Sequence, residues 1–161
     1  MPEDQRDYFL KIDGIEGESQ DQSHRGEIRL HDFNLAMTNR GNRAGYSVGR
    51  PYFEDATFSG PIDASYTKLN EACLKNVAVP KVVLTCRKAG KTQYDFLVIT
   101  FTKVYVTNCR IDTLAESPKM EFTLGFARLQ VDYREQKQEG GLGGALSAVF
   151  ELASGRTEAG S

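Results

Sequence analysis

The chain has 161 residues, a length that suits one domain, because such a chain buries about 70% of the surface that its unfolded form exposes. Its 20 basic and 22 acidic side chains give a formal net charge of −2, which excludes an overall basic field for nucleic acid or anionic membrane. Three cysteines without C-x-x-C spacing indicate neither a disulfide framework nor a zinc knuckle, so reduced cytosolic thiols are expected.

The N-terminal sequence "MPEDQRDYF" lacks the basic and apolar regions of a secretory signal. No apolar run approaches the roughly 20 residues of a membrane span. We therefore expect a protein made in the cytoplasm, without membrane insertion, for which general secretion is not the exit.

The first sixty residues are predicted to be mainly β-strand. Apolar alternation and aromatic residues indicate strands over residues 7–13, 27–37 and 52–60. Residues 38–51, "TNRGNRAGYSVGRP", are rich in glycine, asparagine and arginine and predict a long exposed loop. Long ordered loops are uncommon unless they have a function, so this loop is a candidate contact element.

The second predicted strand changes face along its length. Ile28 and Leu30 lie on one side of a regular strand, whereas the apolar residues from Phe33 onward lie on the other. This change of phase predicts a β-bulge near His31 and Asp32.

A single main helix is predicted, over Asp63–Asn76. Asp63 is a residue type that caps helix N-termini. Tyr66, Leu69 and Cys73 follow at helical spacing, so they form an apolar stripe that faces the core.

The second half of the chain is predicted to contain long strands. Residues 81–87 and 92–108 flank the turn "KAGK" and indicate a hairpin, and residues 119–135 form a further strand. A change of apolar phase in this last strand predicts a second bulge around Gly125–Arg128. Periodicity alone leaves the segment "GLGGALSAVFELASG" open between a helix and a short strand.

These elements predict an all-β fold, a two-sheet β-barrel or sandwich with one flanking α-helix. Such a fold must protect its sheet edges. One domain over residues 1–161 is expected, with its core at about 7–153 and a short flexible C-terminal tail.

The acidic stretch "KIDGIEGESQDQSHRGEI" is a poor metal or catalytic site. An EF-hand needs oxygen ligands at alternate positions after Asp13, where this chain has Ile15 and Gly17. No apolar residues surround the carboxylates to shift a pKa, as acid/base catalysis requires. His24 and His31 lack the context of a metal or nucleophile site and are expected at the surface or in a strand. We therefore predict no metal, no cofactor and no enzymatic activity.

The long loop carries Arg40, Arg43 and Arg50 around Tyr46, a combination that some single-strand nucleic-acid binders use. The acidic total charge favours a protein contact or a solvated loop instead. A nucleic-acid-binding β-barrel module therefore stays open as an alternative function, ahead of an enzyme of unrecognised type.

The segment "YFLKIDGIEGESQDQSHRGEIRL" resembles the N-terminal signature of the haemolysin-coregulated protein (Hcp) family, the tube subunits of bacterial type VI secretion systems. Family members open with a strand ending in "LKIDGI", then "GES", a polar loop with a histidine, and "EI". The segments "IDASYTKLNEAC", "VVLTCRKAG", "YDFLVITFTKVYVTN" and "MEFTLGFARLQVDY" resemble the family's helix and later strands, in the same order. The family's second strand commonly carries tryptophans, which this chain lacks, and Phe33 and Leu35 are expected to replace them in packing.

The resemblance implies a compact two-sheet barrel, six copies of which close a ring. Stacked rings would form a tube that carries effectors in its lumen. The acidic loop would be structural, with Gly14 and Gly17 supplying turns, and the segment near Ala148–Leu152 would be a strand.

The resemblance also implies partners. Besides further copies of the chain these are spike, sheath and effector proteins of the secretion machine, with no nucleic acid. The protein would assemble in the bacterial cytoplasm and then reach the extracellular medium or a target cell without a signal peptide. The subunit-contact candidates, from the long loop and the acidic loop, are Arg40, Arg43, Tyr46, Arg50, Glu16, Glu18 and Asp21.

Overall fold

The computed structural model describes residues 5–39, 52–88, 93–114, 116–136, 142–153 and 156–160. The strands are β1 (Arg6–Ile12), β2 (Ile28–Leu30), β3 (Asp32–Asn34), β4 (Met37–Thr38), β5 (Tyr52–Phe53), β6 (Ala56–Pro61), β7 (Val79–Lys88), β8 (Tyr94–Asp112), β9 (Lys119–Gln136), β10 (Leu142–Ala153) and β11 (Arg156–Gly160). Helix α1 spans Ser65–Lys75. The predicted all-β class is confirmed.

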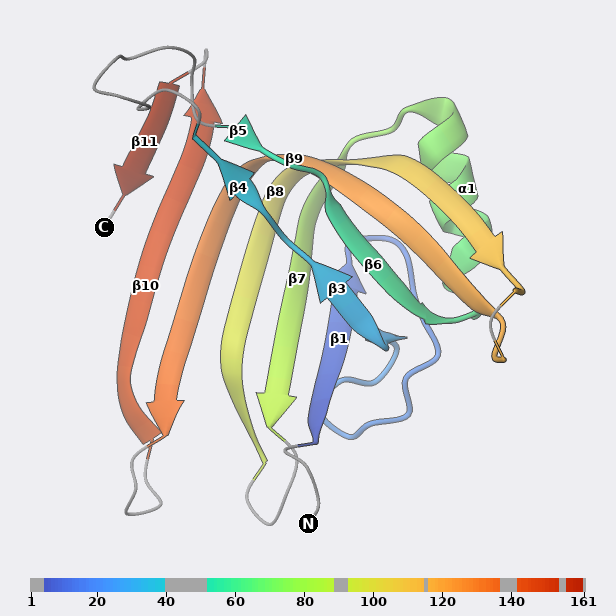
Figure 1. The fold of residues 1–161 in the computed structure, drawn as a ribbon, viewed down its shortest axis with the longest axis horizontal. Coiled ribbons are helices and arrows are strands. Elements are labelled where there is room, and N and C mark those ends of the chain that lie inside the picture. The colour runs from blue at the N-terminus through green and yellow to red at the C-terminus, as the bar shows by residue number, and fades with distance from the viewer. Residues whose placement is uncertain are drawn as a thin grey trace.

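One antiparallel sheet folds over itself to make the barrel. Its main path runs β11-β10-β9-β8-β7-β1-β2, and β6 pairs with both β3 and β9. The length of β9 permits this, because Lys119–Leu124 pair with β6 while Arg128–Gln136 pair with β10. Strands β3 and β6 therefore lie in front of β1, β7 and β8 as a second layer (Figure 1).

The core fills the space between these two layers. Phe58, Phe101 and Phe122 are fully buried there, together with Leu10, Leu84, Leu124 and Leu129. The Phe58 ring stacks on Phe122 at a centroid distance of 5.4 Å and meets Phe101 edge-on at 6.2 Å. Buried aromatic pairs of these geometries add stabilisation beyond the area that they bury.

The change of face at His31 and Asp32 is a break between two strands and not the β-bulge that we predicted. Strand β2 ends at Leu30 and pairs with β1, and β3 begins at Asp32 and pairs with β6. The chain thus passes from one layer to the other at His31, which explains the change of apolar phase. Phe33 then packs edge-on against Tyr8 at 5.3 Å and against the core, as expected in the absence of tryptophan.

The second bulge lies on the partner strand and not at Gly125–Arg128, where we predicted it. The β8–β9 register shifts at Thr107 of β8, whose hydroxyl donates a hydrogen bond to Asp55 at 2.8 Å. The buried positions on β9 do change phase, between Leu124 and Leu129. A change in the apolar pattern of a strand shows that its buried residues move to the other face. It does not show which of the two paired strands contains the extra residue of a bulge.

Helix α1 has 11 residues, Ser65–Lys75, and lies within the predicted span Asp63–Asn76. The Asp63 carboxylate accepts a hydrogen bond from the Ser65 N–H at 2.9 Å, one residue before the helical cap position. Leu69 is fully buried and Tyr66 and Cys73 pack against the core, so the predicted stripe is confirmed. The helix ends at Asn76 in the left-handed conformation, with φ of 52°.

The C-terminal segment is a strand, as the family resemblance implied. Strand β10 pairs with β9, and residues 156–160, which we assigned to a flexible tail, form β11 against β10. Strands β4 and β5 pair at the base of the long loop, whose residues 40–51 lie outside the described residues. In the described part of the chain, no helix has the length and apolar character to cross a membrane.

Candidate subunit interface

The acidic loop between β1 and β2 folds back on itself. Gly14 supplies a turn, with φ of 81°. Gly17 has a different role from the turn that we expected: a Cβ atom there would lie 2.6 Å from the carbonyl oxygen of Glu27. The two arms of the loop are joined by hydrogen bonds from the Gly17 N–H to the Gly26 carbonyl at 2.8 Å and from the Ser19 N–H to Glu27 at 3.0 Å.

Arg87 of β7 anchors this loop to the sheet. Its guanidinium is only 7% exposed and binds both carboxylate oxygens of Asp21, at 2.9 and 2.7 Å. It also binds Asp7 at 3.0 Å and lies over the Phe9 ring at 4.9 Å. The hydrogen bonds from Arg87 lower the pKa of Asp21 to about 2, against a smaller opposing effect of burial. The same bonds raise the pKa of Arg87.

His24 is buried, although we expected it at the surface or in a strand. Its ring stacks on Phe9 at a centroid distance of 4.3 Å. Its Nδ1 atom lies 2.8 Å from Oε2 of Glu27, and Nε2 lies 3.6 Å from Oδ1 of Asp95. The contacts of Arg87 and His24 therefore hold the loop on the sheet. Most of their partners are distant in the sequence, so the sequence alone did not reveal these contacts.

The predicted acidic contact residues differ in their surroundings. Asp21 is paired with Arg87 inside the chain, and Glu18 accepts a hydrogen bond from the Ala64 N–H at 3.0 Å, at the start of α1. Glu16 is exposed. The structure thus gives Asp21 and Glu18 intramolecular roles, and their pairing with a neighbouring subunit stays a prediction.

The predicted basic contact residues lie in the long loop. Arg40, Arg43, Tyr46 and Arg50 fall outside the described residues. Their contacts with the acidic loop likewise stay predictions. In the part of the chain that is described, no three metal-ligating side chains come together.

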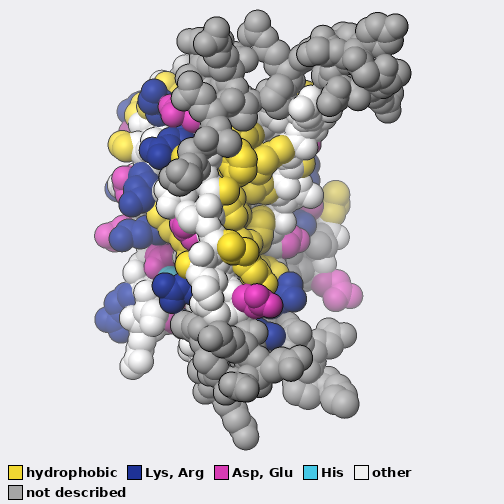
Figure 2. Space-filling view, turned by 90° about the vertical axis from the view of Figure 1, so that its left-hand side faces the viewer, with side chains coloured by type: hydrophobic (Ala, Val, Ile, Leu, Met, Phe, Trp, Pro, Cys, Tyr) yellow, Lys and Arg dark blue, Asp and Glu magenta, His cyan; other side chains and the backbone are white. Residues whose placement is uncertain are grey.

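Sequence reasoning missed an uncovered apolar face on β8, β9 and β10. Leu146, Tyr133 and Leu97 are in register across the three strands, followed on the same face by Ala148 and Val131. Leu146 is 67% exposed and Tyr133 is 41% exposed. Figure 2 shows a continuous hydrophobic strip on this side of the molecule.

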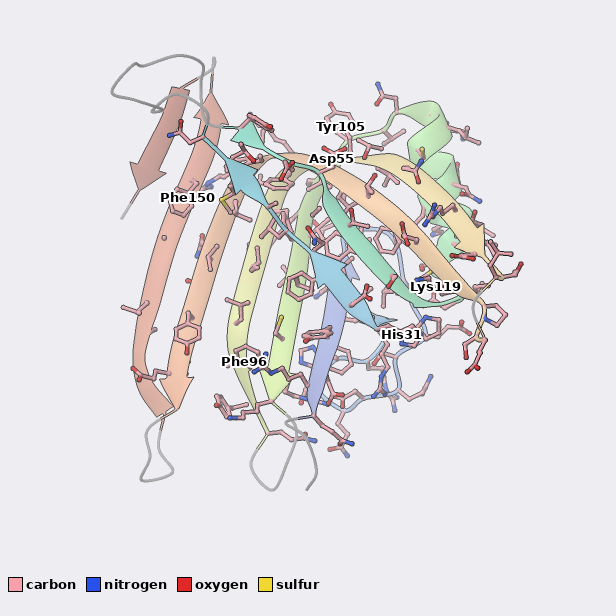
Figure 3. All side chains as sticks on the ribbon, in the orientation of Figure 1. His31, Asp55, Phe96, Tyr105, Lys119 and Phe150 are labelled. Atoms are coloured by element: carbon pink, nitrogen blue, oxygen red, sulfur yellow. The ribbon has the colours of Figure 1, made fainter. Side chains whose placement is uncertain are left out.

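The same three strands are polar on their opposite face. The Ser147 hydroxyl donates a hydrogen bond to Asp132 at 2.6 Å, and the Gln130 amide donates one to Asp132 at 3.1 Å. Further along β10, the apolar face continues at Phe150, which packs against the core and is labelled in Figure 3. This part of the sheet is therefore amphipathic, and no layer built from the described residues covers Leu146 and Tyr133.

The missed face has a physical explanation. The β10 segment fitted a helix as well as a strand, so its apolar residues had no assigned face. The row of Leu146, Tyr133 and Leu97 arises only from the register of three strands, which no local pattern specifies.

Fold and surface together define an antiparallel β-barrel with one flanking helix and an open amphipathic sheet face. The family model for the type VI secretion system effector Hcp matches residues 9–133. Protein hcp1 of Pseudomonas aeruginosa is 34% identical over 144 residues, which cover 83% of this chain and 86% of that relative. The chain belongs to the Hcp family of type VI secretion system proteins.

Solved structures share this architecture. Hcp1 from Salmonella typhimurium is 25% identical, with a TM-score of 0.77 over 95% of this chain and 99% of that chain. A type VI secretion system effector from Yersinia pestis is 29% identical, with a TM-score of 0.74 over 90% and 99% of the two chains. Another type six secretion system protein, at 20% identity, has the same fold with a TM-score of 0.84 over 96% of this chain and 100% of that chain.

Proposed function

We propose that this protein is a tube subunit of a type VI secretion system. Six copies close a ring, the rings stack into a tube with effectors in its lumen, and the protein is itself secreted. Membership of the Hcp family supports this proposal. The single structural observation that carries it is the uncovered apolar row of Leu146, Tyr133 and Leu97.

The uncovered row favours contact with a second copy of the chain. Each Å² of apolar surface removed from water contributes about 25 cal/mol, so covering this face is favourable. The opposite face of these strands is polar, so covering it would not provide this gain in free energy. A ring requires a head-to-tail interface, in which this face of one copy meets a different surface of the next.

A complementary surface is available at the base of the long loop. Met37 of β4 and Tyr52 of β5 are exposed on the hairpin from which the loop extends. We assign this hairpin and its loop to the surface that covers the apolar row of the neighbouring copy. Exposed ion pairs contribute only about 0–1 kcal/mol each, so apolar contact must supply most of the free energy of ring closure.

The substitution Leu146→Lys tests the interface. A charge at Leu146, the most exposed position of the apolar row, should shift the assembly mass in solution from that of a six-membered ring toward that of a monomer. The matched control is Leu74→Lys on α1, where the side chain is 86% exposed and lies away from the row. A Leu146→Lys protein that forms rings as readily as the control would contradict the proposed interface.

Secretion gives a second readout of the same function. We expect the parent protein to pass from the cytoplasm to the medium in cells with an active secretion machine. Leu146→Lys should stay in the cells if export requires assembly into the tube. The spike, sheath and effector proteins are the partners expected at the tube, and co-purification with assembled rings, but not with Leu146→Lys, measures their binding.

A further inference from the structure

A pocket of about 460 Å³ lies at one end of the sheet, where β1, β7, β8 and β9 meet. Phe96 of its wall is labelled in Figure 3. Of the described residues that line the pocket, three are cationic, three are aromatic and one is acidic. A pocket of this size is large enough for a small molecule.

Strand pairing brings the cationic side chains together. Arg6 of β1 and Lys88 of β7 are Cα partners, so they are cross-strand neighbours on one face of the sheet. Arg134 of β9 lines the same pocket. Within the described part of the chain, no carboxylate lies within ion-pair distance of these three side chains. Like charges that face each other across two strands repel, so this end of the sheet attracts an anion.

A β-bulge places an aromatic ring beside these cations. The β7–β8 register shifts between Cys86 and Arg87, so Phe96 is an extra residue on β8. Bulges re-aim side chains and are frequent next to functional sites. The Arg6 guanidinium lies over the Phe96 ring, 5.5 Å from its centroid. The bulge thus joins an aromatic surface to the cationic pair.

Two further aromatic residues line the pocket. Tyr94 of β8 is the Cα partner of Lys88, so it continues the row of Arg6 and Lys88 across a third strand. Tyr133 of β9 is 41% exposed, so part of its surface is available for contact with another molecule. Aromatic side chains bind flat rings by stacking. The pocket therefore offers charge and stacking surface together.

We propose that this pocket binds a small aromatic anion, a planar ring that carries a phosphate or a carboxylate. Arg6 and Lys88 hold the anionic group, and Tyr133 contacts the ring. Glu135 also lines the pocket, where its carboxylate repels a second anionic group and can accept a hydrogen bond from an amino group on the ring. This binding goes beyond the proposed tube function and requires no step of it.

The larger pocket between the acidic loop and α1 has a different charge. Its volume is about 710 Å³, and the described residues that line it include three cationic and three acidic side chains. These charges balance, so that pocket has no preference for an anion. The excess of positive charge distinguishes the pocket at the end of the sheet.

The test titrates the full chain with adenosine monophosphate, which combines a phosphate with a planar base that carries an amino group. Calorimetry measures the dissociation constant. Adenosine lacks the phosphate and ribose 5-phosphate lacks the base, so the two compounds separate the two contacts. We expect adenosine monophosphate to bind at least about tenfold more tightly than either compound. Its affinity should fall as the salt concentration rises, since salt screens exposed charges.

Variants assign the contacts to residues. Arg6→Gln and Lys88→Gln should each weaken binding of adenosine monophosphate by about fivefold or more, and leave binding of adenosine unchanged. Tyr133→Leu should weaken binding of both compounds that carry the base, but not of ribose 5-phosphate. The matched control is Arg110→Gln at the opposite end of β8, where Arg110 pairs with Glu121 at 3.1 Å. It should bind adenosine monophosphate like the parent, and melting temperatures verify that each variant is folded.

Three outcomes would overturn the proposal. The first is that adenosine monophosphate shows no saturable binding to either the assembled or the unassembled fraction of the parent, separated by size. The second is that adenosine or ribose 5-phosphate binds as tightly as adenosine monophosphate. The third is that Arg6→Gln and Lys88→Gln both bind it like Arg110→Gln. Measuring both fractions keeps the result separate from ring assembly.

Discussion

At the scale of single residues, Arg87 is the centre of the molecule's ion-pair network. It joins Asp21 of the acidic loop to Asp7 of β1 while its guanidinium lies over Phe9. A buried arginine with two carboxylate partners is costly to leave unpaired, so Arg87 contributes strongly to holding the acidic loop on the sheet. From its acidic composition we expected the loop to be solvated. Arg87, which pairs with its carboxylate, is distant in the sequence, so this pairing could not be predicted.

Replacing Arg87 by methionine keeps the packing on Phe9 but leaves Asp7 and Asp21 without their partner. We expect the free energy of unfolding to fall by about 2–3 kcal/mol, the contribution of hydrogen bonds to charged groups. Urea denaturation measures the change. The control is Arg29→Met, since Arg29 also pairs with Asp7, at 3.4 Å, but is 63% exposed and should cost under about 1 kcal/mol. Equal losses in the two variants would contradict the central role of Arg87.

The lowered pKa of Asp21 predicts an acid-dependent loss of stability. The pKa of Asp21 is about 2 in the folded protein and 3.8 for an unperturbed aspartate, so the stabilisation is complete above about pH 4. Between about pH 4 and 2 the unfolded chain binds the proton first, and the stabilisation declines. Thermal unfolding across this range should show a steeper loss in the parent than in Asp21→Asn. Parallel pH profiles of the two proteins would be inconsistent with the Arg87 pairing.

At the scale of elements, the acidic loop and the sheet meet at a backbone contact that only glycine allows. Gly17 passes so close to the start of β2 that a side chain would collide with the Glu27 carbonyl. The family-like "GES" therefore marks a close approach between two backbone segments, whereas the turn itself lies at Gly14. The resemblance implied a turn at Gly17, but the glycine is needed there for the close backbone contact.

The substitution Gly17→Ala should lower the free energy of unfolding by about 1–3 kcal/mol, as overpacking does in rigid surroundings. Gly144→Ala on β10 is the control, because no atom lies within 4 Å of the added methyl group. There the free energy should stay constant or rise by up to about 1 kcal/mol, since alanine restricts the unfolded chain. Chemical denaturation of both variants measures the difference, and a tolerated Gly17→Ala would refute the close contact.

At the scale of the whole molecule, the barrel is covered on one side and uncovered on the other. Strand β6 closes the fold over β2, where a Cβ atom on Gly60 would lie 2.6 Å from the Arg29 carbonyl oxygen. Toward β10, no second layer built from the described residues covers Leu146 and Tyr133. The two sides of the barrel therefore differ, as the proposed head-to-tail assembly requires.

Deleting residues 40–49 tests the long loop as an assembly element. The deletion keeps the paired residues of β4 and β5 and every residue of the described core cluster, so the melting temperature of the monomer should change little. Ring formation or stacking, measured by assembly mass and by electron microscopy, should weaken. Replacing Arg40, Arg43 and Arg50 by glutamine separates the effect of charge from that of length. Normal rings and tubes from the deletion variant would mean that the loop has another role.

The sequence by itself determined the β class, the helix near Asp63–Asn76, the change of apolar phase at His31 and the family signature. Each of these follows from local information: apolar periodicity, a capping residue, a phase change, or a short contiguous motif. The helix stripe of Tyr66, Leu69 and Cys73 was predictable because helical spacing alone brings those residues together.

Tertiary structure decided whatever depends on pairing between distant segments. Strand register placed Leu146 beside Tyr133, and packing of the acidic loop on the sheet buried His24 against Phe9. A one-residue shift in register would turn every side chain of a strand to the other face, so no local pattern can specify these neighbours.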